Sequence, residues 1–197
     1  EMYSILADCS RQLKDRQGEI SSIAFYVKNF PDAPRAGSFR ERMFEISCSE
    51  KNDEKIGQSW IAMDDSSRTK ELFLNQFFLQ QKGKNRKESC DSLAQKLLKV
   101  NPKHVAALEW LGEKYYWIGE NLFVQSNKNY EQNKTSLNYL KLTRDFEVVS
   151  TNFNKALTYF NVLWETDHSP RYASFLANIH NRFKNKQKSD YYRSFIK

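Results

Sequence analysis

The chain has 197 residues, of which 40% are hydrophobic, 14% aromatic and 28% charged, and this composition excludes an intrinsically disordered tail. Its formal charge is +7, and the positive charge is concentrated in residues 82–103 and 171–197. Three cysteines without a CxxC pair give no metal-ligand pattern, and no apolar run approaches the roughly 20 residues of a membrane-spanning helix.

Apolar residues three and four positions apart predict helices along nearly the whole chain, and the six glycines and four prolines leave few breaks between them. We expect the first helix to end at Gly18 and the second to end at Phe30–Pro31. A third helix is expected from about Pro34 to Cys48. The predicted apolar positions of the first two helices are Ile5, Leu6, Cys9, Leu13, Ile20, Ile23, Ala24 and Val27.

Capping residues set the expected starts of the helices in the middle of the chain. Asn52 or Asp53 is predicted to cap a fourth helix, and Ser66 or Ser67 a fifth that ends at Gly83. A sixth begins near Ser89 and ends before Pro102. A seventh follows Pro102, and the polar segment 127–135 reads as a connection.

The segment after residue 138 differs from the others, because its apolar steps alternate between three and four without interruption. These positions are Tyr139, Leu142, Phe146, Val149, Phe153, Ala156, Phe160 and Leu163. They predict one helix of roughly 30 residues, about 45 Å long, that ends at the turn 167–170. A last helical pair is expected over 170–196. No long segment alternates with period two, so the predicted fold class is all-α.

A family resemblance follows from the segment HVAALEWLGEKYYWIG at 104–119. It resembles the first helix of a tetratricopeptide repeat, with Leu108, Leu111, Gly112 and Tyr115 at the large, apolar, small and aromatic positions. Pro34 and Pro102 lie 68 residues apart, twice the family's period of about 34. In addition, KNFPDAPRA at 28–36 resembles the turn of repeat proteins that serve bacterial outer-membrane assembly.

This resemblance implies a right-handed α-solenoid in a single domain, 1–197, built of about five stacked helical hairpins. The expected hairpins are 2–30, 33–64, 67–100, 103–167 and 170–196. The fourth is elongated by an insertion. The apolar pattern of its second helix begins at Ala156, whereas an uninterrupted repeat would begin this pattern at Val124.

In the family, the first helix of each repeat lines a concave groove that binds a polypeptide. The positions that match here, and that the resemblance implies as partner-binding residues, are Asn75, Glu109, Glu113, Tyr116, Trp117, Arg171, Ser174, Asn178 and Arg182. The family's carboxylate clamp uses Lys and Asn, so Glu109 and Glu113 have the wrong charge for it and favour a basic or aromatic-bearing segment. In the alternative, Glu109 and Glu113 are an i, i+4 pair on an exposed face. Tyr116 and Trp117 then pack on the inserted helix, which covers the groove.

Catalytic chemistry is not expected from this chain. It contains no nucleophile elbow, zinc-protease motif or phosphate-binding loop. His104 and His168 are expected to be capping or exposed residues, and His180 a core residue. The sequence therefore predicts no enzyme activity, no cofactor and no metal site, and favours a non-enzymatic scaffold that binds another protein or peptide.

Binding of nucleic acid or of an anionic surface is the alternative function, because the C-terminal stretch interleaves cations with aromatic residues. Its expected contact residues are Lys184, Lys186, Lys188 and Arg193. The identity of the partner, the oligomeric state and the compartment stay open. Because the chain begins at Glu1 and not at Met, the expectation leans towards the cell envelope or periplasm.

Overall fold

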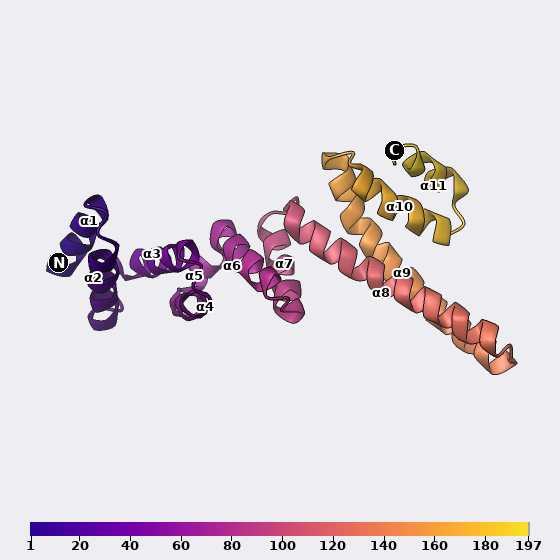
Figure 1. Ribbon diagram of the computed structural model, residues 1–197, viewed down its shortest axis with the longest axis horizontal. Helices are drawn as coiled ribbons and strands as arrows, with labels where there is room; N and C mark the ends of the chain where they lie inside the picture. The colour runs from indigo at the N-terminus through magenta and orange to yellow at the C-terminus, as the bar shows by residue number, and fades with distance from the viewer. Residues whose placement is uncertain (197) are drawn as a thin grey trace. The chain divides into compact units, whose positions relative to one another are not determined.

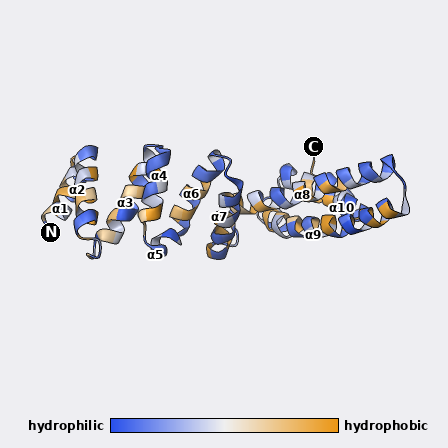
Figure 2. Ribbon diagram, turned by 90° about the horizontal axis from the view of Figure 1, so that it is seen from below, coloured by the Kyte–Doolittle hydropathy of each residue, from blue (hydrophilic) through white to orange (hydrophobic). Residues whose placement is uncertain are grey.

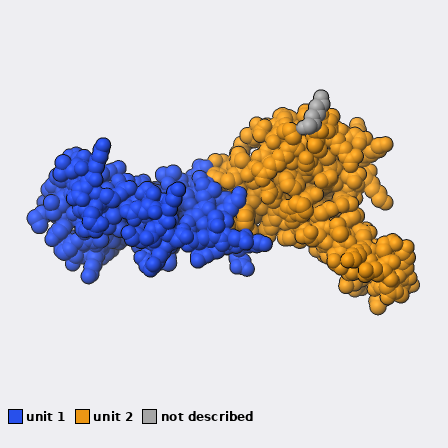
Figure 3. Space-filling view, in the orientation of Figure 1, with its two compact units in different colours: residues 1–89 blue, residues 90–197 orange. Residues whose placement is uncertain are grey.

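The computed structural model describes residues 1–196, and these form 11 helices and no strand (Figure 1). The chain divides into two compact units, residues 1–89 and 90–197 (Figure 3). Each unit has a hydrophobic core of its own. Hydrophobic and hydrophilic residues alternate along the helices, as amphipathic helices require (Figure 2). The prediction of an all-helical chain is confirmed for the described residues.

Unit 1 contains six helices joined by short turns. They are α1 (Met2–Gln12), α2 (Arg16–Asn29), α3 (Ala36–Ser49), α4 (Asp53–Ala62), the single turn α5 (Asp65–Arg68) and α6 (Glu71–Gly83). Two of them carry side-chain N-caps: Asp15 accepts a hydrogen bond from the amide of Gly18, and Asn52 from the amide of Lys55. The predicted cap of α4 at Asn52 is thus confirmed.

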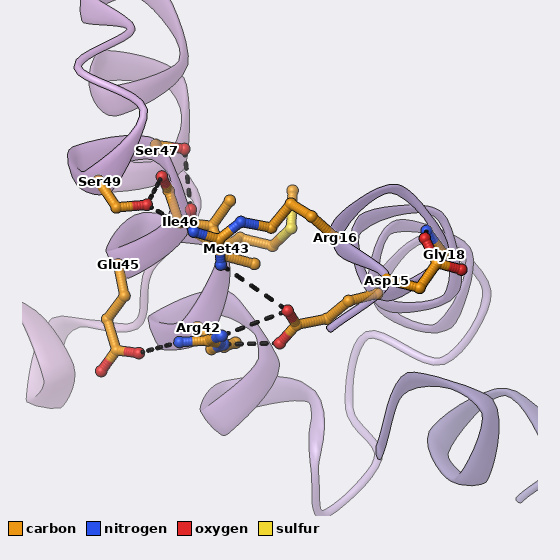
Figure 4. A network of polar contacts seen from close by, with 10 residues as sticks. Asp15, Arg16, Gly18, Arg42, Met43, Glu45, Ile46, Ser47 and Ser49 are labelled. Atoms are coloured by element: carbon orange, nitrogen blue, oxygen red, sulfur yellow. Dashed lines mark hydrogen bonds and ion pairs between the residues drawn. The ribbon is translucent and has the colours of Figure 1, made fainter. Parts of the chain in front are cut away.

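Antiparallel neighbours α1–α2 and α3–α4 bury the core of unit 1 between them. One cluster includes Ile23, Tyr26 and Phe39, and a second surrounds Phe44 with Ile56, Met63 and Phe73. A buried ion pair joins α2 to α3: Arg42 Nε lies 2.7 Å from Glu19 Oε1, and the same guanidinium reaches Glu45 at 3.1 Å (Figure 4). Glu19 is only 3% exposed, so this carboxylate depends mainly on Arg42 for compensation, with Arg16 farther away at 3.9 Å.

Unit 2 is dominated by a long helical hairpin. Helix α7 (Lys87–Val100) begins just before the boundary, and α8 (Val105–Gln132) and α9 (Ser136–Thr166) then run side by side in opposite directions (Figure 1). The pair α10 (Pro170–Arg182) and α11 (Lys186–Arg193) follows. The predicted long helix is confirmed as α9, which has 31 residues.

The core of unit 2 lies along the inner faces of α8, α9 and α10. Phe153 and Phe160 of α9 and Leu176 of α10 are completely buried there. Two glycines of α8 lie against those phenylalanine rings: Gly119 faces Phe153, and Gly112 faces Phe160. The small position of the repeat fingerprint, Gly112, therefore allows close helix approach, as the sequence pattern predicts.

Four local expectations from the sequence are wrong, the last of them a single helix from Ser66 or Ser67 to Gly83. Gly18 does not end the first helix; it lies in the first turn of α2, because Asp15 caps that helix. Ile5, Leu6 and Leu13 of α1 are exposed, while Ala7 is buried, so α1 packs with a different face inward from the one expected.

The third error concerns the polar segment 127–135, most of which is helical. Helix α8 continues to Gln132 because its polar side chains are bound locally and across the hairpin. The Ser126 hydroxyl donates to Asp145 Oδ2 of α9 at 2.6 Å, and the Asn127 amide donates to the Phe123 carbonyl at 2.7 Å. In the middle of the chain, Ser67 and Gly83 fall in separate helices, α5 and α6.

Histidines and cysteines are placed mostly as structural groups. His104 caps α8 by accepting from the amide of Ala107, His168 is exposed, and His180 is buried and stacked on Tyr192. Cys90 is buried, whereas Cys9 is exposed. Among residues 1–196, no cluster of His, Cys, Asp or Glu has the arrangement of a metal site, and no helix is long and apolar enough to cross a membrane.

Candidate functional site

Most of the predicted partner-binding residues lie on one side of unit 2, where α8 and α10 face each other. We call this the α8–α10 surface and define it by Glu109, Glu113, Tyr116, Trp117 and Glu120 of α8 and by Arg171, Ser174, Asn178 and Arg182 of α10. Asn75, the ninth predicted residue, belongs to α6 in unit 1 and is half-buried there.

The two helices of this surface are connected by a ladder of polar contacts. Arg171 Nη1 donates to Glu109 Oε1 at 2.9 Å, and Asn178 Nδ2 donates to the Tyr116 hydroxyl at 3.3 Å. One sequence separation, 62 residues, relates the members of both pairs. A constant separation means that α8 and α10 run parallel and in register along this surface.

Each end of the ladder is a charge-assisted cluster. At the N-terminal end, Arg171 also donates to Glu113, and the Tyr172 hydroxyl donates to Glu109 Oε1 at 2.8 Å. At the C-terminal end, Arg182 holds Glu120 through two nitrogens, one of them at 3.1 Å. The sequence analysis did not predict the contacts of Glu120 and Tyr172. These contacts depend on the register between α8 and α10, which lie about two repeats apart in the sequence.

The ladder perturbs the ionisation of its own members. Burial works to lower the pKa of Arg171, but its hydrogen bond to Glu113 and the charge of Glu109 outweigh burial and hold that pKa above its ordinary value. Burial, together with the hydrogen bond to Glu109, raises the pKa of Tyr172 to about 12. At neutral pH Arg171 is therefore protonated and positively charged, and Tyr172 is protonated and uncharged.

Paired carboxylates change the expected character of this surface. Glu109 and Glu113 share the single positive charge of Arg171, so this cluster keeps one net negative charge instead of the two that the sequence suggests. Trp117 is the exposed aromatic residue of this surface. Its side chain is 51% exposed and packs edge-on against Tyr116, with ring centres 5.1 Å apart. Tyr116 itself is buried between α8, α9 and α10, in contact with Phe153 and Phe175.

The predicted anion-binding residues lie next to this surface, at the turn into α11. Lys184 occupies the left-handed backbone region, with φ of 57°, and Lys186, Lys188 and Arg193 belong to α11. All four are exposed. The helix dipole disfavours the cations Lys186 and Lys188 in the first turn of α11 and favours Arg193 in its last turn.

Unit 1 carries a hollow that the sequence did not reveal. A cavity of about 420 Å³ lies between α2, α3 and α4, with an apolar floor that includes Val27, Met43 and Ile46. Its charged rim is largely paired, since Arg40 binds Asp64 at 2.9 Å and Lys55 binds Glu50 at 3.2 Å. This cavity offers apolar contact but little net charge to select a ligand.

Comparison with solved structures shows which fold this is. A protein from Bacteroides ovatus, described as a candidate protein-binding protein, superposes with a TM-score of 0.64 at 12% identity, over 91% of this chain and 96% of that one. A tetratricopeptide repeat protein from Parabacteroides merdae gives a TM-score of 0.47 at 16% identity, over 96% of this chain and 77% of that one. The first of these likenesses shows a shared fold, and the expected all-α architecture of successive helical hairpins is confirmed.

No family model matches the sequence. A search of curated proteins also finds no match.

Proposed function

We propose that this chain is a non-enzymatic scaffold that binds a polypeptide segment on the α8–α10 surface, with Trp117 as the central contact. The observation that carries this proposal is the exposure of Trp117 on a surface where most other members are paired with one another. Exposed tryptophan on a rigid support is the side chain most enriched among residues that dominate binding energy at protein interfaces.

Rigidity is the contribution of the ladder. Because Glu109, Tyr116 and Glu120 are tied to α10, the two helices present a fixed surface and lose little conformational entropy on binding. The buried ring of Tyr116 supports the indole of Trp117 from below. A partner therefore gains apolar contact with the indole and hydrogen bonds with exposed polar groups such as Asn178.

The electrostatics favour a partner selected by shape and apolar contact. Since Arg171 and Arg182 compensate two of the three carboxylates Glu109, Glu113 and Glu120, only one net negative charge remains, and binding should depend only modestly on salt. The fold supports the same reading, because helical-hairpin repeats offer extended surfaces for polypeptides, and the structurally similar Bacteroides ovatus protein is itself described as a candidate protein-binding protein.

The second candidate function uses the exposed cations at the turn into α11. Lys184, Lys186, Lys188 and Arg193 offer four positive charges within ten residues to a phosphate backbone or an anionic surface. Affinity of that kind falls steeply as salt rises, whereas Trp117-centred binding does not.

A nuclease-treated pull-down from native extract at about 150 mM salt distinguishes the two functions. It compares the wild-type chain with Trp117→Ala and with a control, Ile61→Ala, which removes an even more exposed apolar side chain from unit 1. Tyr116 stays intact because it is buried. We expect a polypeptide that wild type and Ile61→Ala retain and Trp117→Ala loses. Equal retention by all three, or recovery of nucleic acid alone, would contradict the proposal.

A further inference from the structure

A pocket of about 430 Å³ opens in unit 2 at the end of α10. Its volume falls within the range of roughly 300–1,000 Å³ that is usual for ligand sites. Three partly exposed aromatic rings line it: Phe123 of α8, Phe146 of α9 and Phe183, which follows α10. Phe123 and Phe146 stack in parallel with ring centres 5.4 Å apart.

The pocket exists because the hairpin of α8 and α9 extends beyond the end of α10, which packs on it. Helix α10 ends at Arg182, whereas α8 and α9 continue towards their common turn at residues 133–135 (Figure 1). The apolar seam of the hairpin therefore emerges from beneath α10. Phe153, under α10, is fully buried, while Phe146, two turns nearer the tip of the hairpin, is only partly covered.

The charged side chains that line the pocket are all positive. Arg182 and Lys184 both line it, and no carboxylate does so among the described residues. The Arg182 guanidinium is held by Glu120 and lies 4.2 Å from the centre of the Phe123 ring. The Lys184 ammonium, in contrast, makes no ion pair within residues 1–196, and the side-chain amide of Asn181 beside it makes no hydrogen bond there.

The backbone fixes Lys184 at the mouth of this pocket. Its amide donates to the Asn181 carbonyl at 3.0 Å, and the next amide, that of Asn185, donates to the His180 carbonyl at 2.9 Å. The left-handed conformation at Lys184 closes this turn. The position of the cation is consequently set by the turn, and only its side chain remains free to meet a ligand.

We propose that this pocket binds an aromatic side chain of a polypeptide whose neighbouring residue is a carboxylate. The ring packs beside the stacked pair Phe123 and Phe146, and the carboxylate binds Lys184 with the amide of Asn181 as a second donor. The inference rests on the proposed function, because Arg182 belongs both to this pocket and to the α8–α10 surface. It adds a partner chemistry: an acidic residue beside an aromatic one.

Short peptides test the pocket by itself. The probe is an acetylated and amidated peptide, Gly-Ser-Gly-Asp-Phe-Asp-Gly-Ser-Gly, titrated into the full chain while NMR follows the methyl groups of Val149, which also lines the pocket. We expect saturable shifts with a Kd on the order of 0.1–1 mM, as suits a single anchoring side chain. Peptides with Lys in place of both Asp residues, or Ala in place of Phe, should bind about tenfold more weakly or not at all.

Two variants with a matched control locate the binding. Lys184→Glu should weaken the Asp-Phe-Asp peptide by about tenfold, whereas Lys186→Glu, with the same charge change in the same turn but outside the pocket, should change it by less than about twofold. Ser150→Trp, which places an indole in the pocket from α9, should abolish the Val149 shifts. Equal effects of the two lysine variants, or binding that ignores the charge of the peptide, would overturn the proposal.

The outcomes also separate this inference from the proposed function. Trp117→Ala should leave the short peptide's affinity unchanged, because that peptide reaches only the pocket. Loss of pull-down partners in Trp117→Ala without any peptide-induced shift of Val149 would refute the pocket and leave the α8–α10 surface standing. Tighter binding of adenosine monophosphate than of the Asp-Phe-Asp peptide would overturn the polypeptide assignment in favour of a nucleotide.

Discussion

Gly119 of α8 lies directly against the ring of Phe153 of α9. A Cβ atom built at position 119 would be 2.9 Å from the Cδ1 and Cε1 atoms of that ring. Seven residues earlier in α8, a Cβ atom built at Gly112 would be 3.1 Å from the Cε1 and Cζ atoms of Phe160. The long hairpin is thus built on a repeated glycine–phenylalanine contact that lets its two helices approach closely.

Substitution of Gly119 tests that contact. Gly119→Ala should destabilise unit 2 by about 1–2 kcal/mol, because an overpacking cost of about 2–3 kcal/mol exceeds the gain of about 1 kcal/mol in helix propensity. Gly57→Ala in α4, where nothing lies within 4 Å of the added atom, should be neutral or stabilising by up to about 1 kcal/mol. Urea unfolding of both variants measures the difference, and equal stabilities would show that α8 and α9 are not in this register.

The phenylalanine side of the seam gives a second prediction. Phe153 is completely buried, so Phe153→Ala should cost about 3–5 kcal/mol through lost burial and a cavity beneath α10. Leu140→Ala, on the same helix but 57% exposed, should change the free energy of unfolding by less than about 0.5 kcal/mol. Thermal and urea unfolding report both values; a loss below about 1 kcal/mol for Phe153→Ala would mean that this face is solvated.

In unit 1, the buried carboxylate of Glu19 depends on Arg42. Arg42→Ala should destabilise the unit by about 3 kcal/mol, because it leaves a carboxylate that is only 3% exposed with no cation closer than Arg16, at 3.9 Å. Adding Glu19→Gln should restore part of that loss. Lys55→Ala, which breaks a pair whose lysine side chain is 54% exposed, should cost less than about 1 kcal/mol and serves as the control. Similar losses for Arg42→Ala and Lys55→Ala would refute the dependence.

Alkaline pH tests the hydrogen bond between Tyr172 and Glu109. The folded state raises the pKa of Tyr172 from 10.0 to about 12, so its stabilising contribution is complete below pH 10 and disappears as pH rises towards 12. Tyr172→Phe should therefore be less stable than wild type by about 1 kcal/mol at pH 8. By about pH 12 that deficit should vanish. A deficit that is independent of pH would assign the effect to packing.

The sequence predicts those features of the fold that depend on neighbouring residues, and misses those that depend on packing between helices. The long helix α9 was predictable because its apolar steps are continuous, and the cap at Asn52 because capping is a local hydrogen bond. The exposed face of α1 and the helical state of 127–132 were not predictable, because both depend on what packs beside those residues.

The same distinction applies to the candidate site. The resemblance placed Glu109, Tyr116 and Arg171 among the partner-binding residues, and the structure brings them onto one surface. It could not reveal that Glu109 binds Arg171 or that Tyr116 binds Asn178, since both pairs depend on the constant separation of 62 residues between α8 and α10. Likewise, the pocket at Phe123 arises from a difference in helix length, which no single helix displays.

The most direct test of the proposed function is photo-crosslinking in native extract. A benzoylphenylalanine in place of Asn121, one turn beyond Trp117 on the exposed side of α8, reports what contacts the α8–α10 surface. The same group in place of Ile61 of α4, which is 74% exposed, is the control. We predict a discrete polypeptide adduct from position 121 and none of that size from position 61. Identical adducts from both positions, or adducts only with nucleic acid, would contradict the assignment of the α8–α10 surface as a polypeptide-binding site.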